Sequence, residues 1–170
     1  NTSTAYEPGS GSSIMGYAGI CGNDDLQVNS DPFFHWVSFD EVIAHVDTVI
    51  PQVGTRTPTG NSVPTVNAGS NFTIPASTPF QLTAAGSDGD AADVLIYSWE
   101  QANLGPQQDV SAGDNGSSPL FRSFSATTDA VRVFPRYQDL LNNTTVVGET
   151  PPTSARSLDF RVTVRDNRPG

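Results

Sequence analysis

Residues 94–101 read VLIYSWEQ, and their side chains alternate in a way that only an extended chain explains. Leu95, Tyr97 and Trp99 stand at every second position, so they lie on one face of a strand. The simplest interpretation of Trp99 is a core residue. A tryptophan in the third strand is also where immunoglobulin-like sandwiches place a core aromatic. The stretch therefore predicts a half-buried β-strand.

The chain on either side repeats this pattern. Short Thr/Val/Phe-rich runs are separated by turn-forming clusters such as SDGDAAD and AGDNGSS. This spacing predicts a mainly β fold, an antiparallel immunoglobulin-like sandwich over residues 64–170. The remaining expected strands are 64–69 with 71–75, 79–86, 120–125, 131–135 and 158–166. We expect the sandwich to lack its last strand, which leaves residues 158–166 with an unpaired edge.

The overall charge restricts the partners. The 170 residues carry 8 basic against 18 acidic side chains, a formal net charge of -10, and every basic residue is Arg. A chain this acidic cannot neutralise phosphates, which argues against nucleic acid. No apolar run approaches the roughly 20 residues that a membrane-spanning helix needs, so membrane insertion is not expected.

Residues 1–50 differ in composition from 64–170, and the Pro- and Gly-containing stretch 51–63 between them is expected to be a linker. The first part is Gly/Ser-rich and then helical. Within it, residues 39–49 are predicted to form a helix, with Ser38 as N-cap and Glu41 completing a capping box. Pro51 ends it.

One face of this helix is predicted to be apolar. Val37 and Val42 are placed to form a hydrophobic staple across its start. Helical spacing then aligns Val42, Ile43, Val46, Val49 and Ile50. So short a helix needs something to pack on, and we expect that partner upstream of the chain.

The glycine-rich segment before the helix carries a family resemblance. Residues 13–21, SIMGYAGIC, resemble the Met-turn of metzincin zinc peptidases, most closely the secreted bacterial reprolysin-like type. Residues 29–35 (NSDPFFH), the helix opening 38–41 (SFDE) and the join at 60–69 are also similar to that family. The resemblance implies that residues 1–50 are the C-terminal end of a metzincin α/β catalytic domain.

It also implies roles for particular residues. Met15 would form the apolar floor beneath the zinc, while Tyr17 and Ala18 would line the wall of the S1′ pocket. The family binds zinc through H-E-x-x-H-x-x-G-x-x-H, whose Glu is the general base. That motif does not occur here, so the ligands and base are expected upstream, and the 170 residues alone are predicted to be inactive.

The two histidines do not replace the motif. His35 and His45 are ten residues apart, and we expect both to be structural or solvent-facing. The parent would be a secreted, extracellular hydrolase that acts on protein or peptide substrates. Its upstream segment or neighbouring protein chains would be the partners of this one. Cys21, the only cysteine, would pair with an upstream cysteine or stay free.

A second group of candidate site residues is acidic. Asp88, Asp90 and Asp93 alternate with small residues between two expected strands, and Asp166 and Asn167 should lie at the same end of the sandwich. Carboxylates on a backbone that can curl suit a hard cation, and such a calcium ion would resemble those of cadherin-like and polycystic-kidney-disease-type modules. The alternative is a solvated turn in which Asp caps backbone amides.

Asparagines in N-x-[ST] sequences are glycosylation candidates, although a Thr/Ser-rich chain also produces such matches by chance. They are Asn1, Asn71, Asn115, Asn142 and Asn143. A second reading of the whole chain remains open beside the peptidase. It is a non-catalytic extracellular binding or structural module, with or without calcium, that acts within a larger assembly.

Overall fold

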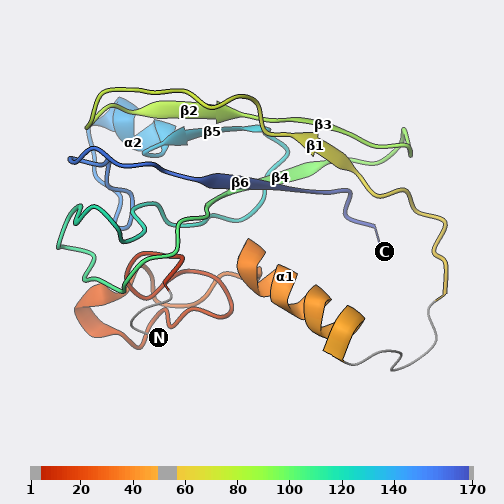
Figure 1. Cartoon of the computed structure of the whole chain (residues 1–170), viewed down its shortest axis with the longest axis horizontal. Coiled ribbons are helices and arrows are strands. Elements are labelled where there is room, and N and C mark those ends of the chain that lie inside the picture. Colours follow the sequence, from red (N-terminus) through yellow and green to blue (C-terminus); the bar gives the residue numbers. More distant parts are fainter. Residues whose placement is uncertain (1–4, 50–56, 169–170) are drawn as a thin grey trace.

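The fold is mainly β, as the alternating sequence predicted. The computed structural model describes residues 5–49 and 57–168, and Figure 1 shows the course of the chain. Expectations for Asn1, for Ile50 and for residues 51–56 of the linker lie outside the described residues. All strand pairs are antiparallel. No described helix is long and apolar enough to cross a bilayer.

The strands form two layers (Figure 1). In the first, β1 (Thr65–Asn67) pairs with β3 (Ala85–Ser87), and β2 (Phe80–Thr83) pairs with β5 (Val131–Phe134). Ala84 joins β2 to β3 and donates its amide to Ala130 O at 3.0 Å, which keeps the two pairs in one layer. In the second, β4 (Ile96–Gln101) pairs with β6 (Phe160–Arg165).

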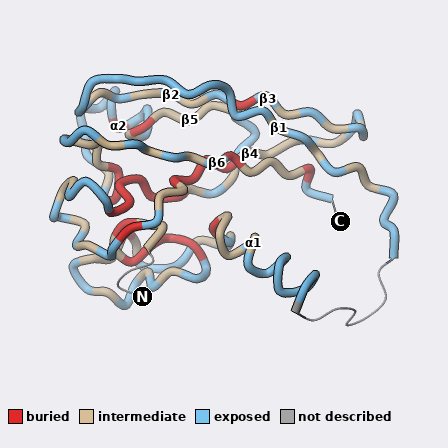
Figure 2. Tube along the Cα trace, viewed as in Figure 1, coloured by how far each residue is buried: buried red, intermediate tan, exposed pale blue. Residues whose placement is uncertain are grey.

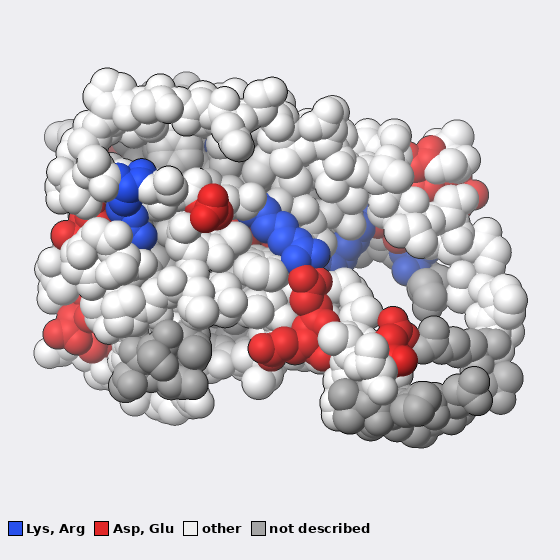
Figure 3. All heavy atoms as spheres, in the orientation of Figure 1, with Lys and Arg blue, Asp and Glu red and all other residues white. Residues whose placement is uncertain are grey.

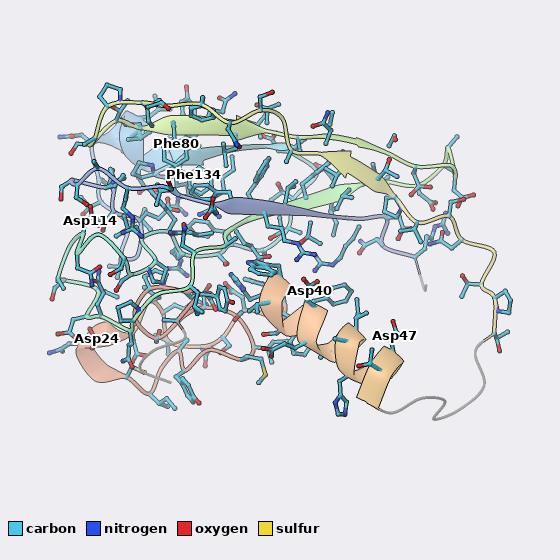
Figure 4. The ribbon with its side chains drawn as sticks, in the orientation of Figure 1. Asp24, Asp40, Asp47, Phe80, Asp114 and Phe134 are labelled. Carbon is cyan, nitrogen blue, oxygen red and sulfur yellow. The ribbon has the colours of Figure 1, made fainter. Side chains whose placement is uncertain are left out.

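The core lies between these layers and is aromatic. Trp99 of β4 stands opposite Val162 of β6, and both side chains are buried. Phe80 stacks on Phe134 with ring centroids 5.0 Å apart, and Figure 4 shows both rings between the layers. The indole Nε1 of Trp99 donates to Ala130 O at 3.0 Å, so this large residue also has its polar atom satisfied.

Two of the expected strands are wrong. Residues 71–75 form no strand, and Phe72 is exposed. Residues 120–125 contribute only the isolated bridge between Phe121 and Glu149. The reason for the second is that the amides of Leu120 and Phe121 both donate to the side-chain Oε1 of Gln101, at 2.8 and 3.0 Å, instead of to a neighbouring strand.

The helices also differ from the prediction. Helix α1 (Trp36–Ala44) begins three residues earlier than expected and continues as a π-helical turn, η2 (His45–Val49). Its N-cap is His35, so the predicted Ser38–Glu41 capping box is wrong and Ser38 lies inside the helix. A short helix, α2 (Tyr137–Asn142), lies in a stretch for which no helix was predicted.

Helix α1 lies over the outer face of the β4–β6 pair, but most of its own surface stays exposed. Arg161 of β6 forms an ion pair with Asp40, and its guanidinium stacks over the Trp36 ring at 4.8 Å. The predicted apolar residues Val42, Ile43 and Val46 are all exposed, and Figure 2 shows most of the helix in the exposed colour. In the described chain, the apolar stripe therefore has no core to pack on.

Candidate functional site

The segment that resembles a Met-turn is a tight turn. The Gly16 amide donates to Ser13 O at 2.9 Å, which places Ile14 and Met15 at the two central positions. The Tyr17 amide then donates to Ser10 O at 2.7 Å. A Cβ on residue 16 would lie 2.9 Å from the same Ser10 oxygen, so this close crossing of the chain favours glycine there.

The turn presents its apolar side chains outward. Met15 is 65 % exposed and Tyr17 is 61 % exposed, and Ile14 and Ile20 beside them are also exposed. Ala18, the other expected pocket residue, is partly buried. Polar bonds hold the loop beneath them, since the Ile14 amide donates to Phe33 O at 2.9 Å.

A partly buried carboxylate that the sequence pattern did not reveal organises this loop. Glu7 Oε1 accepts the amide of Ser12 at 2.9 Å and its hydroxyl at 3.0 Å, while Oε2 accepts the Ser13 hydroxyl at 2.5 Å. Ser12 Oγ also lies 3.0 Å from Ser123 O, on the sandwich side. Glu7 therefore holds the turn through Ser12 and Ser13, and Ser12 links the turn to the segment 120–125. No motif spacing signals this role of Glu7.

The histidines lie away from the turn's exposed face. His35 is buried, and its Nδ1 accepts the Val37 amide at 3.4 Å, which makes it the cap of α1. Its Nε2 lies 3.9 Å from Glu100 Oε1. His45, at the end of α1, is exposed. Neither histidine belongs to a cluster of three metal-ligating side chains among the described residues.

The structure brings three of the five expected calcium ligands together. One carboxylate oxygen from each of Asp88, Asp90 and Asp93 lies within 4.8 Å of the others. In Figure 3, acidic groups gather over the loop that follows β3. Asp88 Oδ2 is buried and has no hydrogen-bond partner among the described residues, a state that a bound cation would relieve.

Contacts that would compete with a bound cation surround this loop. Arg168 lies 2.6 Å from Asp93 Oδ1, and the Ser62 amide donates to Asp90 Oδ2 at 2.7 Å. Asp166 stands beside the group instead of within it, because its oxygens accept from Asn61 Nδ2 and the Arg168 amide. These hydrogen bonds lower the pKa of Asp166, the Arg168 amide having the largest effect.

The same end of the molecule carries an open cleft of about 760 Å³. It is lined by residues 57–61 of the linker, residues 90–93 and Arg168. Asn167 follows Asp166 in the left-handed region, with φ of 64°, which turns the chain back toward the loop. The loop after β3, the end of β6 and the end of the linker thus meet at one place.

The remaining candidates are surface features. Cys21 is partly exposed, and its Sγ contacts Tyr17 O at 3.6 Å. Asn115 is exposed, but its side chain bonds to Ser117 and Ser118 and so caps a turn. The other described glycosylation candidates are all exposed: Asn71, Asn142 and Asn143.

No family model, curated protein or solved structure matches this chain. Its function therefore has to be argued from its own residues.

Proposed function

We propose that this chain is the C-terminal part of a secreted bacterial metzincin-type zinc endopeptidase, from the Met-turn onward, followed by an accessory sandwich domain. The observation that carries the proposal is the turn at Met15. Its backbone closes between Ser13 and Gly16, and hydrogen bonds to Ser10 and Phe33 fix it on both sides. Met15 and Tyr17 nevertheless face outward, where an apolar partner surface would cover them.

The exposed stripe of α1 supports the same proposal. Val42, Ile43 and Val46 form an apolar helix face without a partner in the described chain. Like Met15, this face would pack on the rest of a catalytic domain. The zinc ligands and the general base would come from that part, because the described residues of this chain hold no such set.

In that setting the chain would shape the active site without performing the chemistry. Bound zinc would supply the activated water that hydrolyses the peptide bond. Met15 would provide an apolar floor, and Tyr17 and Ala18 would line the pocket that receives the side chain after the scissile bond. Glu7 would keep these residues in place through Ser12 and Ser13.

The strand pairing supports an immunoglobulin-like sandwich for residues 64–170. In such a fold the first strand pairs with the second, the second with the fifth, and the third with the sixth. Here β1 pairs with β3, the continuation of β2, then β2 with β5 and β4 with β6. On this proposal the seventh strand would lie beside β6.

The test is an intact mass and elemental metal analysis of the natural protein that contains this stretch. One bound zinc, a mass well above 18.0 kDa and chelator-sensitive hydrolysis of casein are expected. The isolated 170 residues should show no such hydrolysis. A natural protein near 18.0 kDa without zinc would reject the proposal.

The second candidate function is a non-catalytic extracellular module stiffened by calcium. The observation in its favour is the grouping of Asp88, Asp90 and Asp93 where the linker meets the strands. A cation there would bind the loop after β3 and so fix the direction in which residues 57–61 leave the sandwich. Calorimetric titration with Ca²⁺ against Mg²⁺ would test it.

A further inference from the structure

A buried acid–base pair joins the N-terminal part of the chain to the sandwich. Glu100 of β4 is 1 % exposed and His35 at the start of α1 is 2 % exposed. Their Oε1 and Nε2 atoms are 3.9 Å apart, although 65 positions separate the residues in sequence. The Trp36 amide donates to Glu100 Oε2 at 3.1 Å, so the first turn of α1 is held by both side chains.

The capping bond fixes the protonation of His35. Nδ1 accepts the Val37 amide at 3.4 Å, and a nitrogen that accepts carries no proton. An imidazolium carries protons on both nitrogens, so its Nδ1–H would face the Val37 N–H and the two donors would repel each other. His35 is therefore neutral, with its proton on Nε2. Burial also lowers the pKa of His35, against the raising effects of Glu7 and the Gln101 carbonyl.

Glu100 lies in surroundings that oppose its charge. Its Oε1 has no hydrogen-bond partner among the described residues. Burial, together with the charge of Glu7 in the N-terminal segment, raises the pKa of this carboxyl to about 7. The Trp36 amide, Arg165 of β6 and the Ser123 hydroxyl act in the opposite direction. Arg132 of β5 is a further cation that interacts with Glu100.

We propose that docking of residues 5–44 onto β4 moves one proton from His35 to Glu100, and that the resulting neutral pair holds this segment until Glu100 ionises. When the segment is detached, the imidazolium and the carboxylate are both hydrated. On docking, the His35 Nδ1 proton leaves and the Val37 amide takes its place as donor. The same proton neutralises Glu100, so nothing is released to solvent. The inference does not depend on the peptidase proposal.

This exchange has a distinctive pH dependence. Between the ordinary pKa values, 4.5 for Glu and 6.5 for His, both forms of the pair carry one proton, so docking does not respond to pH. Above 6.5 the detached form loses its proton while docked Glu100 keeps its own to about 7. Docking then takes up a proton, so it weakens as the pH rises through this range.

The variants Glu100→Gln and His35→Asn separate the contribution of His35 from that of Glu100. Asn at position 35 still caps a helix. The opening constant, measured from exchange of the Trp36 and Val37 amides after correction for intrinsic rates, should then respond to pH. Between pH 4.5 and 6.5, the opening constant should rise by about tenfold for each unit of pH increase in His35→Asn. In Glu100→Gln it should fall by about tenfold for each unit of pH increase over the same range. The double variant and the wild type should both stay nearly flat.

His45→Asn, which changes an exposed histidine at the end of α1, should behave like the wild type. Because a variant can fail to fold, the wild-type chain is also titrated by NMR. The expected result is a His35 ring protonated only on Nε2 and a Glu100 carboxyl carbon that titrates near neutral pH. A Glu100 that titrates near 4.5, or a His35 that becomes charged near 6.5 while docked, overturns the proposal.

Discussion

The guanidinium of Arg132 lies 2.5 Å from Glu149 Oε1, and the Glu149 side chain has no exposed surface. Arg132 stands on β5 and also lies over the Phe134 ring at 4.2 Å. The second oxygen of Glu149 accepts the Arg136 amide. The pair therefore ties the strand β5 to the loop that precedes residue 150, at the edge of the aromatic core.

Replacing Arg132 with Met should destabilise the chain by about 3–5 kcal/mol, because it leaves the buried Glu149 carboxylate without its cation. The measurement is the free energy of unfolding from urea denaturation. The matched control is Arg136→Met, which breaks the pair with Asp139, where the arginine side chain is 54 % exposed. That control should cost less than about 1 kcal/mol. Equal losses in the two variants would contradict the prediction.

Calcium should raise the thermal midpoint of unfolding if the three aspartates form a site, because a ligand that binds only the folded state stabilises it. Asp90→Asn should remove most of this increase, and Arg168→Gln should enlarge it, since Arg168 competes for Asp93. Glu41→Gln, on the exposed side of α1, serves as the control. No change of the midpoint up to millimolar Ca²⁺ would favour a solvated turn.

Acid should remove the contribution of Asp114 to the stability of the fold. Although burial acts to raise it, hydrogen bonds from Ser154, Gly116 and Arg156 hold the pKa of Asp114 well below its ordinary value of 3.8. A lowered pKa stabilises the fold above pH 3.8, and this stabilisation is lost as the pH falls through the folded-state value. The stability difference between wild type and Asp114→Asn should therefore shrink below pH 3.8. A constant difference down to pH 2 would show that the charge of Asp114 does not matter.

Local patterns were sufficient for two strands with an alternating apolar face. The alternation around Trp99 and along 158–166 predicted β4 and β6, because Tyr97, Trp99, Phe160 and Val162 on these faces pack in the core. The prediction failed where a distant side chain replaces a backbone partner. Gln101 satisfies the amides of Leu120 and Phe121, and no pattern within 120–125 reveals this.

The buried pair was missed for a related reason. Glu100 follows Trp99, so alternation assigns it to the outer, solvated face of its strand. That face is covered by the N-terminal segment, and the Trp36 amide reaches Glu100 across 64 positions in sequence. The same contact moves the start of α1, because His35 and Glu100 satisfy amides that a Ser38 cap would have left outside the helix. Long-range contacts of this kind are invisible to helix-capping rules.

The open edge of β6 should be visible in amide exchange. The Ala102 amide donates to Asp159 O at 2.7 Å, and antiparallel pairing alternates from there. Arg161, Thr163 and Arg165 therefore bond toward β4. The amides of Phe160, Val162 and Val164 point to the other edge, where β6 has no strand partner in the described chain.

Exchange should consequently alternate along one strand. Hydrogen–deuterium exchange followed by NMR is expected to show Arg161, Thr163 and Arg165 protected at least tenfold more than Phe160, Val162 and Val164. Tyr97 of β4 is the internal control, because it points away from β6 yet bonds to Thr127 in both directions. It should be protected. Uniform protection along β6 would mean that another strand covers this edge in solution. Slow exchange with a concentration-dependent mass would identify that strand as a second copy of the chain.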